Sequence, residues 1–197
     1  MTEYFLAHWL ETIGLLSGLL CVWLLIKQNI FTFPIGLVYA LVTVVVVFNE
    51  RLYSDVLLNF YYVLMNGYGW FYWLRGGQER RVGQYLKVCS IPPEIIKWVL
   101  LVVGLGTIAM GWFFNNYTNA ELAYADSFTT VSSFVTMYLS AKKYLESWLL
   151  WVVIDVVQVV LYLLKGIELY AFLYLIYLYM AYVGWNAWKQ PLNFEQY

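Results

Sequence analysis

Residues 148–166 read WLLWVVIDVVQVVLYLLKG, an apolar run long enough to cross a lipid bilayer as a helix. The run carries an acid, Asp155, close to its middle. A charged side chain at that depth costs about 2.5–3.5 kcal/mol on insertion scales, so an acid there indicates a functional site. Trp151, Asp155, Gln158 and Tyr162 are spaced to share one helical face, which we expect to line a cavity inside a helix bundle. The alternative is that Asp155 and Gln158 only hydrogen-bond neighbouring helices.

The composition indicates an integral membrane protein. Of its 197 residues, 63% are hydrophobic and 12% are charged, whereas soluble domains average about 25% charged residues. Hydropathy predicts seven spans, at residues 11–27, 32–48, 52–74, 95–114, 124–141, 147–164 and 167–188. The polar stretch between the third and fourth spans is expected to be a surface connection. The predicted fold class is therefore an all-α polytopic membrane protein.

An internal repeat underlies these spans. A shift of 115 residues places the Gly-Trp-x-x-Trp pattern at Gly69 on the same pattern at Gly184, without any gap. The first three spans therefore repeat as the last three, and the fourth span is a linker helix. This 3+1+3 order makes the two copies parallel, which is a known plan for transporters with a site between the copies. The predicted division is 1–74 for the first three-helix repeat, 75–123 for a cytoplasmic loop and the linker helix, and 124–197 for the second repeat and the C-terminal tail.

Basic residues set the predicted orientation. The side that holds the N-terminus has only Arg51 and Lys165, whereas the other side has Lys27, Arg75, Arg80, Arg81, Lys87, Lys97, Lys142, Lys143 and Lys189. By the positive-inside rule, the N-terminus is outside and the C-terminus is cytoplasmic. Glu11 and Asp126 then begin the first and fifth spans at the outer surface. Each either complements the helix dipole or attracts a substrate.

The two copies differ where a single site would require it. The equivalents of Trp151 and Asp155 are Gly36 and Ala40, so the second span is small and apolar where the sixth is aromatic and polar. Complementary faces occur in the third and seventh spans, with Asn59, Tyr62 and Asn66 in the third and Tyr174 and Tyr177 in the seventh. For each tyrosine, a core or interfacial position is an equal alternative. We predict a pocket between the halves for a flat, polar, cationic ligand.

Several other classes of site and protein are disfavoured. Cys21 and Cys89 lie in unrelated contexts and His8 stands alone, so neither a metal site nor a cofactor is expected. No basic cluster suits nucleic acid. An intramembrane enzyme needs a nucleophile–base pair or metal ligands, which the spans lack, and it is kept as a remote alternative. A photosensor would need a Schiff-base lysine midway along the last span, and there is none.

The chain resembles the PnuC family of bacterial vitamin transporters over nearly its whole length. The matching segments are ETIGLLSGLLCVWLLIKQN, FPIG and LYSDVLLNFYYVLMNGYGWFYW in the first half, and ADSFTTVSSF, LESWLLWVVIDVVQVVLYLLKG and GWNAW in the second. The resemblance implies a seven-helix fold like that of the sugar-transporting SWEET proteins, and a homotrimer. It also implies facilitated diffusion of nicotinamide riboside, thiamine or a related vitamin across the bacterial inner membrane. Cytoplasmic phosphorylation would then trap the product.

The family's recognition motif departs from its usual form here. Many nicotinamide riboside carriers have Trp-x-x-x-Asn, which reads Trp151-Val-Val-Ile-Asp155 in this chain, and Asn59 takes the place of a Gln in the usual LLQ stretch. Nicotinamide riboside and thiamine both carry a cationic ring and a hydroxyl arm, so we expect nicotinamide riboside, with thiamine as the alternative. Trp151 would stack on the ring, Asp155 and Gln158 would bind polar or charged groups, and Asn59 and Tyr62 would close the pocket.

Overall fold

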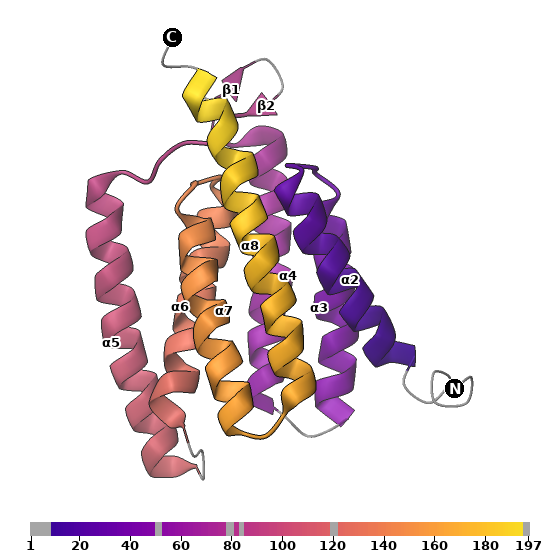
Figure 1. Cartoon of the computed structure of the whole chain (residues 1–197), viewed down its shortest axis with the longest axis vertical. Helices are drawn as coiled ribbons and strands as arrows, with labels where there is room; N and C mark the ends of the chain where they lie inside the picture. Colours follow the sequence, from indigo (N-terminus) through magenta and orange to yellow (C-terminus); the bar gives the residue numbers. More distant parts are fainter. Residues whose placement is uncertain (1–8, 50–52, 78–80, 83–84, 119–121, 195–197) are drawn as a thin grey trace. The chain divides into compact units, whose positions relative to one another are not determined.

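The computed structural model describes residues 9–49, 53–77, 81–82, 85–118 and 122–194 (Figure 1). The chain divides into two compact units, Met1–Lys87 and Val88–Tyr197. The first unit contains α2 (Trp9–Ile26), α3 (Thr32–Asn49), α4 (Tyr53–Arg75) and an antiparallel pair of short strands, β1 (Arg81–Val82) and β2 (Tyr85–Leu86). The second unit contains α5 (Pro93–Tyr117), α6 (Ala123–Ala141), α7 (Ser147–Leu164) and α8 (Glu168–Phe194).

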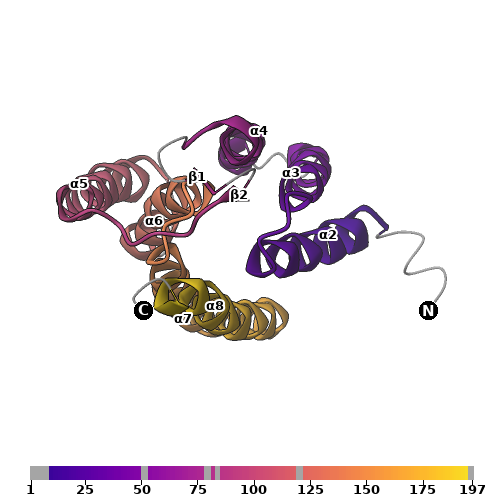
Figure 2. The same cartoon turned by 90° about the horizontal axis from the view of Figure 1, so that it is seen from above.

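Consecutive helices pack against one another within each unit. In the first unit α3 contacts both α2 and α4, and in the second α5 contacts α6, α6 contacts α7 and α7 contacts α8 (Figure 2). Most large apolar side chains of α5 are exposed, among them Trp98, Leu105 and Trp112. Among the described helices, α5 and α7 are long and apolar enough to cross a membrane, and shorter apolar stretches occupy Thr12–Ile26 and Thr32–Val45. Apolar faces exposed to this extent suit contact with lipid.

Each of the seven predicted spans coincides with a helix, so the all-α prediction is confirmed for the described residues. The largest difference is at α8, which continues to Phe194 instead of ending at residue 188. Hydropathy detects only the apolar part of a helix. The polar residues Lys189, Gln190 and Asn193 extend α8 without adding to that part, so the predicted end came too early.

The connection before α5 is more ordered than the surface connection that its polar sequence predicted. Residues 88–91, which we call the strap, lie against the turn between α6 and α7. The amide of Leu145 donates to the carbonyl of Cys89 (2.9 Å), and the amide of Ile91 donates to the carboxylate of Glu146 (2.7 Å). Ile91 is buried. Ser90 is exposed, as a surface connection predicts, but the prediction was wrong for Val88 and Ile91, whose side chains are buried.

The helices and turns of the two units follow the shift of 115 residues seen in the sequence. Thr32 begins α3 and Ser147 begins α7. In the turns before them, Gln28 (φ 53°) and Lys143 (φ 56°) occupy equivalent positions, in a left-handed conformation that is uncommon outside glycine. In each turn the next residue donates its amide to the carbonyl five residues earlier, at 2.9 Å and 3.0 Å. The helices before these turns, α2 and α6, thus both end in a Schellman motif, in which that bond satisfies a helix-terminal carbonyl.

One aromatic contact also occurs in both copies. Phe33 of α3 meets Trp73 of α4 edge-on, with ring centroids 4.9 Å apart and an interplanar angle of 88°. At the equivalent positions, Trp148 of α7 meets Trp188 of α8 edge-on, at 5.4 Å and 88°. All four side chains are buried. The repeated sequence therefore makes repeated contacts inside each unit, and edge-on pairs of this kind add about 0.5–1.5 kcal/mol beyond their buried area.

Gly184 lets the Trp148 ring lie directly on α8. A Cβ at Gly184 would come within 2.6 Å of three ring carbons of Trp148, and Trp148 is only 1% exposed and so has no free space to enter. We expect Gly184→Ala to destabilise the protein by about 1–3 kcal/mol through overpacking. Thermal unfolding in detergent measures this effect. Gly104→Ala on α5 is the matched control, because a Cβ there meets nothing within 4 Å; a Gly184→Ala protein that melts no lower than this control would contradict the expectation.

Candidate substrate-binding site

The predicted polar face of α7 lies on one uninterrupted helix. Asp155 is buried, with 4% of its surface exposed, and Trp151, Gln158 and Tyr162 are half-buried. Exposed valines mark the opposite side of the helix, at Val153, Val156 and Val160. The helix thus presents one polar and aromatic face and one apolar face, as the spacing predicted.

Asp155 has no partner of its own within the described part of the chain. No described residue donates a hydrogen bond to its carboxyl group or forms an ion pair with it. A buried carboxylate that lacks a partner loses the hydration of its charge without compensation. A cation that reached Asp155 would supply that compensation, so this position favours a positively charged ligand.

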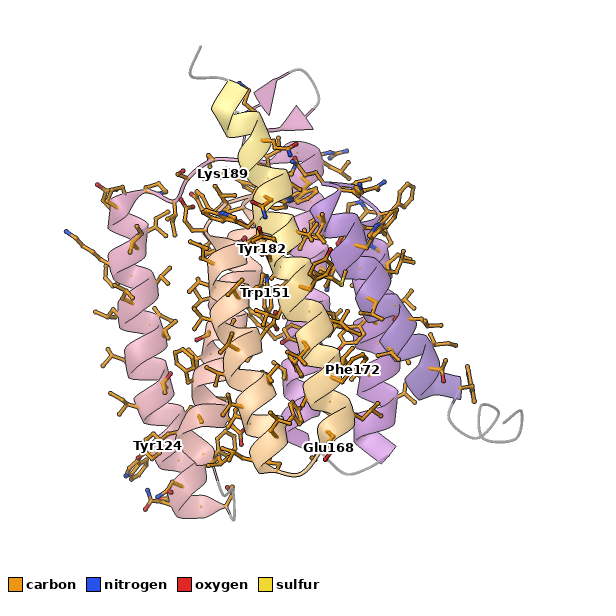
Figure 3. All side chains as sticks on the ribbon, viewed as in Figure 1. Tyr124, Trp151, Glu168, Phe172, Tyr182 and Lys189 are labelled. Carbon is orange, nitrogen blue, oxygen red and sulfur yellow. The ribbon has the colours of Figure 1, made fainter. Side chains whose placement is uncertain are left out.

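Trp151 is anchored to the neighbouring helix. Its indole Nε1 donates to Ser140 Oγ of α6 at 3.2 Å, and Ser140 is 6% exposed. Figure 3 shows Trp151 on α7 within the second unit. Because the indole N–H is bonded to the protein, Trp151 can offer a ligand its ring face rather than its donor.

A column of tyrosines joins α7 to α8. The Tyr162 ring stacks with both Tyr170 (5.2 Å, 22°) and Tyr174 (5.3 Å, 18°), and Tyr174 in turn meets Tyr177 at 5.9 Å and 63°. The structure therefore brings together the three predicted tyrosines of this unit. Sequence reasoning missed Tyr170, although its spacing of four and seven residues from Tyr174 and Tyr177 was the available signal.

In the first unit, the predicted residues follow one face of α4. Asn59 and Asn66 are buried and Tyr62 is half-buried. Asn66 Nδ2 donates to the backbone carbonyl of Tyr62 at 2.8 Å. The Asn66 side chain also lies against Gly36 of α3, where a Cβ would overlap it. Asn66 thus packs between α3 and α4, and a pocket shared by the two halves stays a prediction.

Bulk is exchanged between the two copies at these positions. Gly36 of α3 is equivalent to Trp151 of α7, and Asn66 of α4 is equivalent to Ala181 of α8, which is buried. In the first copy the larger side chain comes from the third helix and sits on a glycine. In the second copy it comes from the second helix. Only the second copy therefore has a tryptophan, Trp151, one helical turn before an acid, Asp155.

Asp126 forms an ion pair that the sequence did not reveal. Lys165 Nζ at the end of α7 lies 2.8 Å and 3.0 Å from the two carboxylate oxygens of Asp126 in α6. Both side chains are partly exposed, so the pair is worth about 0–1 kcal/mol. Asp126 also stands in the first turn of α6, where the helix dipole favours an acid. The side chain of Glu11, its counterpart in the repeat, lies outside the described residues.

The part of the chain that the structure describes contains no candidate metal site. No three His, Cys, Asp or Glu side chains come close enough together there to hold an ion. The chemistry on offer is a carboxylate, an amide, hydroxyls and stacked rings.

Comparisons with known proteins match nearly the whole chain. The model of the nicotinamide mononucleotide transporter family matches residues 8–190. The nicotinamide riboside transporter PnuC of Escherichia coli K12 is 29% identical, over 91% of this chain and 84% of its own. The riboflavin/roseoflavin transporter RibM of Streptomyces davaonensis is 24% identical over the same shares.

A solved structure agrees in fold. The crystal structure of the vitamin B3 transporter PnuC superposes with a TM-score of 0.73 and 23% identity, over 96% of this chain and 85% of the other. The seven helices of the described residues and this likeness identify a polytopic helical membrane protein. The chain belongs to the nicotinamide mononucleotide transporter family, in agreement with the PnuC resemblance of its sequence.

Proposed function

We propose that this chain carries nicotinamide riboside across the bacterial inner membrane by facilitated diffusion. Membership of a transporter family supports transport rather than catalysis, and several relatives, including the one from Escherichia coli, are described as nicotinamide riboside transporters. The observation that carries the proposal is the buried Asp155 carboxyl, one helical turn from the Trp151 ring and without a partner among the described residues.

The chemistry of nicotinamide riboside fits this pair. Its pyridinium ring is flat and positively charged, and it bears a carboxamide and a ribose. An indole face attracts such a cation through its ring quadrupole, and a nearby carboxylate adds charge pairing in a site of low dielectric. Gln158, half-buried on the same face, offers an amide to the carboxamide or the ribose hydroxyls.

The proposed transport unit is two parallel three-helix repeats, α2–α4 and α6–α8, joined by α5 as in the SWEET proteins. The matching turns and edge-on aromatic pairs of the two copies support this arrangement. Asn59, Tyr62 and Asn66 would face the ligand from α4, and Tyr174 and Tyr177 from α8. The N-terminus would lie outside and the C-terminus in the cytoplasm, in a homotrimer. The proposed domain limits are those predicted from the repeat, 1–74, 75–123 and 124–197.

Thiamine is the second candidate, because its cationic thiazolium ring would meet the same carboxyl. The riboflavin transporter among the relatives suggests a third ligand to compare. Riboflavin has a neutral ring system, and Asp155 would give it no charge pairing. Titration of the purified protein with nicotinamide riboside, thiamine and riboflavin therefore tests the assignment. Tightest binding of riboflavin would overturn it.

Transport should be passive. Asp155 is the one buried acid among the side chains that the structure describes, and a single acid makes no proton relay through the helices. We expect proteoliposomes to equilibrate nicotinamide riboside without a proton or sodium gradient. When the proteoliposomes also enclose a nicotinamide riboside kinase and ATP, radiolabelled nicotinamide riboside added outside should accumulate inside as its phosphorylated product. Uptake that stops unless an ion gradient is imposed would sink the passive mechanism.

A further inference from the structure

The hydrogen bond between Trp151 and Ser140 joins two helices at the candidate site. Trp151 lies in the second turn of α7, and Ser140 lies in the last turn of α6, where its hydroxyl accepts the indole N–H at 3.2 Å. We propose that Ser140 is a positioning residue for Trp151, and that its hydroxyl fixes the ring plane on which the substrate ring stacks. This inference rests on the proposed function.

The geometry of an indole explains why one hydrogen bond can set the stacking surface. The N–H lies in the plane of the ring, so a bond to α6 holds that edge of the ring on α6. Both ring faces then point perpendicular to the bond, where a flat ligand can stack. Ser140 is buried, so the loss of its hydroxyl would leave the indole N–H without an acceptor. A buried donor without an acceptor is unfavourable, so the ring would turn towards another acceptor or bind less well in its present position.

The repeat supports a specific role for the pair. The equivalents of Ser140 and Trp151 in the first copy are Leu25 and Gly36. The hydroxyl and the indole therefore occur together in one copy, and the other copy has neither. The buried hydroxyls of Thr129, Ser133 and Thr136 on α6 donate within their own helix, as Ser133 does to the carbonyl of Thr129 at 2.7 Å. Ser140 differs because its hydroxyl serves the neighbouring helix.

A double-mutant cycle tests the proposal. Binding of nicotinamide riboside is measured by calorimetry in detergent for wild type, Ser140→Ala, Trp151→Phe and the double variant. We expect Ser140→Ala to weaken binding about 5- to 10-fold in the wild-type background, from a lost hydrogen bond of about 1 kcal/mol or slightly more. Phenylalanine has no N–H, so the same change should alter binding less than about 2-fold in the Trp151→Phe background. Equal losses in both backgrounds, or no loss in either, would overturn the positioning role.

The matched control is Ser133→Ala, which removes an equally buried hydroxyl from the same helix and should leave binding within about 2-fold of wild type. A loss there as large as that of Ser140→Ala would mean a general packing effect, and the positioning role would fall. If Ser140→Ala does not purify as a folded protein, Ser140→Cys takes its place in the same cycle. Cysteine has a similar shape to serine, but its sulfur is a poor hydrogen-bond acceptor.

The wild-type titration separates this inference from the proposed function. If wild type does not bind nicotinamide riboside, both are wrong. If wild type binds it and Ser140→Ala binds equally well, transport of nicotinamide riboside stands and the role of Ser140 is refuted.

Discussion

Asp155→Asn should weaken binding of nicotinamide riboside by at least about 30-fold. The loss of one member of a buried charge pair costs about 2–5 kcal/mol, and 2 kcal/mol corresponds to about 30-fold in the dissociation constant. Asparagine keeps the shape and two hydrogen-bonding atoms, and it is the residue that many nicotinamide riboside carriers have in this motif, so the lower end of this range applies. The reduced dihydro form of nicotinamide riboside has a similar shape and a neutral ring. Its binding should change much less, and calorimetry of both ligands on both proteins measures the difference.

Glu168→Gln is the matched control for charge. It removes an acid at the start of α8, in the same unit, where the side chain is exposed (Figure 3). Solvent and salt screen such a charge, so binding should stay close to that of wild type. If Asp155→Asn weakened the charged and the neutral ligand alike, Asp155 would act as part of a hydrogen-bond network, and the charge-pairing role would be wrong.

Trp151→Ala should weaken binding about 5- to 150-fold, because aromatic stacking on a flat ring is worth about 1–3 kcal/mol. Trp151→Phe keeps a ring but loses the N–H that Ser140 accepts, so it should lose some affinity but less than Trp151→Ala. Trp112→Ala removes an indole from the exposed face of α5 and should leave binding unchanged. The measurement is the dissociation constant in detergent, with a melting curve for each variant. An equal loss in the Ala and Phe variants would assign Trp151 a structural role instead.

Much of the fold was predictable because its signals are local. Apolar runs of membrane length mark the helices, and polar or basic residues separate them, as Lys27 and Lys142 do at the ends of α2 and α6. The Gly-Trp-x-x-Trp pattern revealed the repeat because its glycine and its second tryptophan each make a specific packing contact. Gly184 has the Trp148 ring directly on its backbone, and Trp188 supplies the edge-on contact.

The contacts that the sequence did not predict depend on how neighbouring helices are rotated against one another. Most of α7 is Val, Leu and Ile, which carry no sign of what each side will meet, so neither Ser140 as the partner of Trp151 nor Lys165 as the partner of Asp126 could be read from spacing. Helical spacing alone places Asn66 on the same face of α4 as Asn59 and Tyr62. The packing of Asn66 on Gly36 needed a close approach of α3 and α4 that helical periodicity alone does not specify.

The strap sets an order of events during biosynthesis. Ile91 and Glu146 are 55 residues apart, so the ribosome finishes the strap, α5 and α6 before the Glu146 carboxylate exists. Until then the Ile91 amide must bond to water, and the segment ahead of α5 has nothing to dock on. Its docking is therefore a late step of assembly. A nascent chain that ends within α6 would present the strap to proteases, and a chain that extends through α7 would protect it.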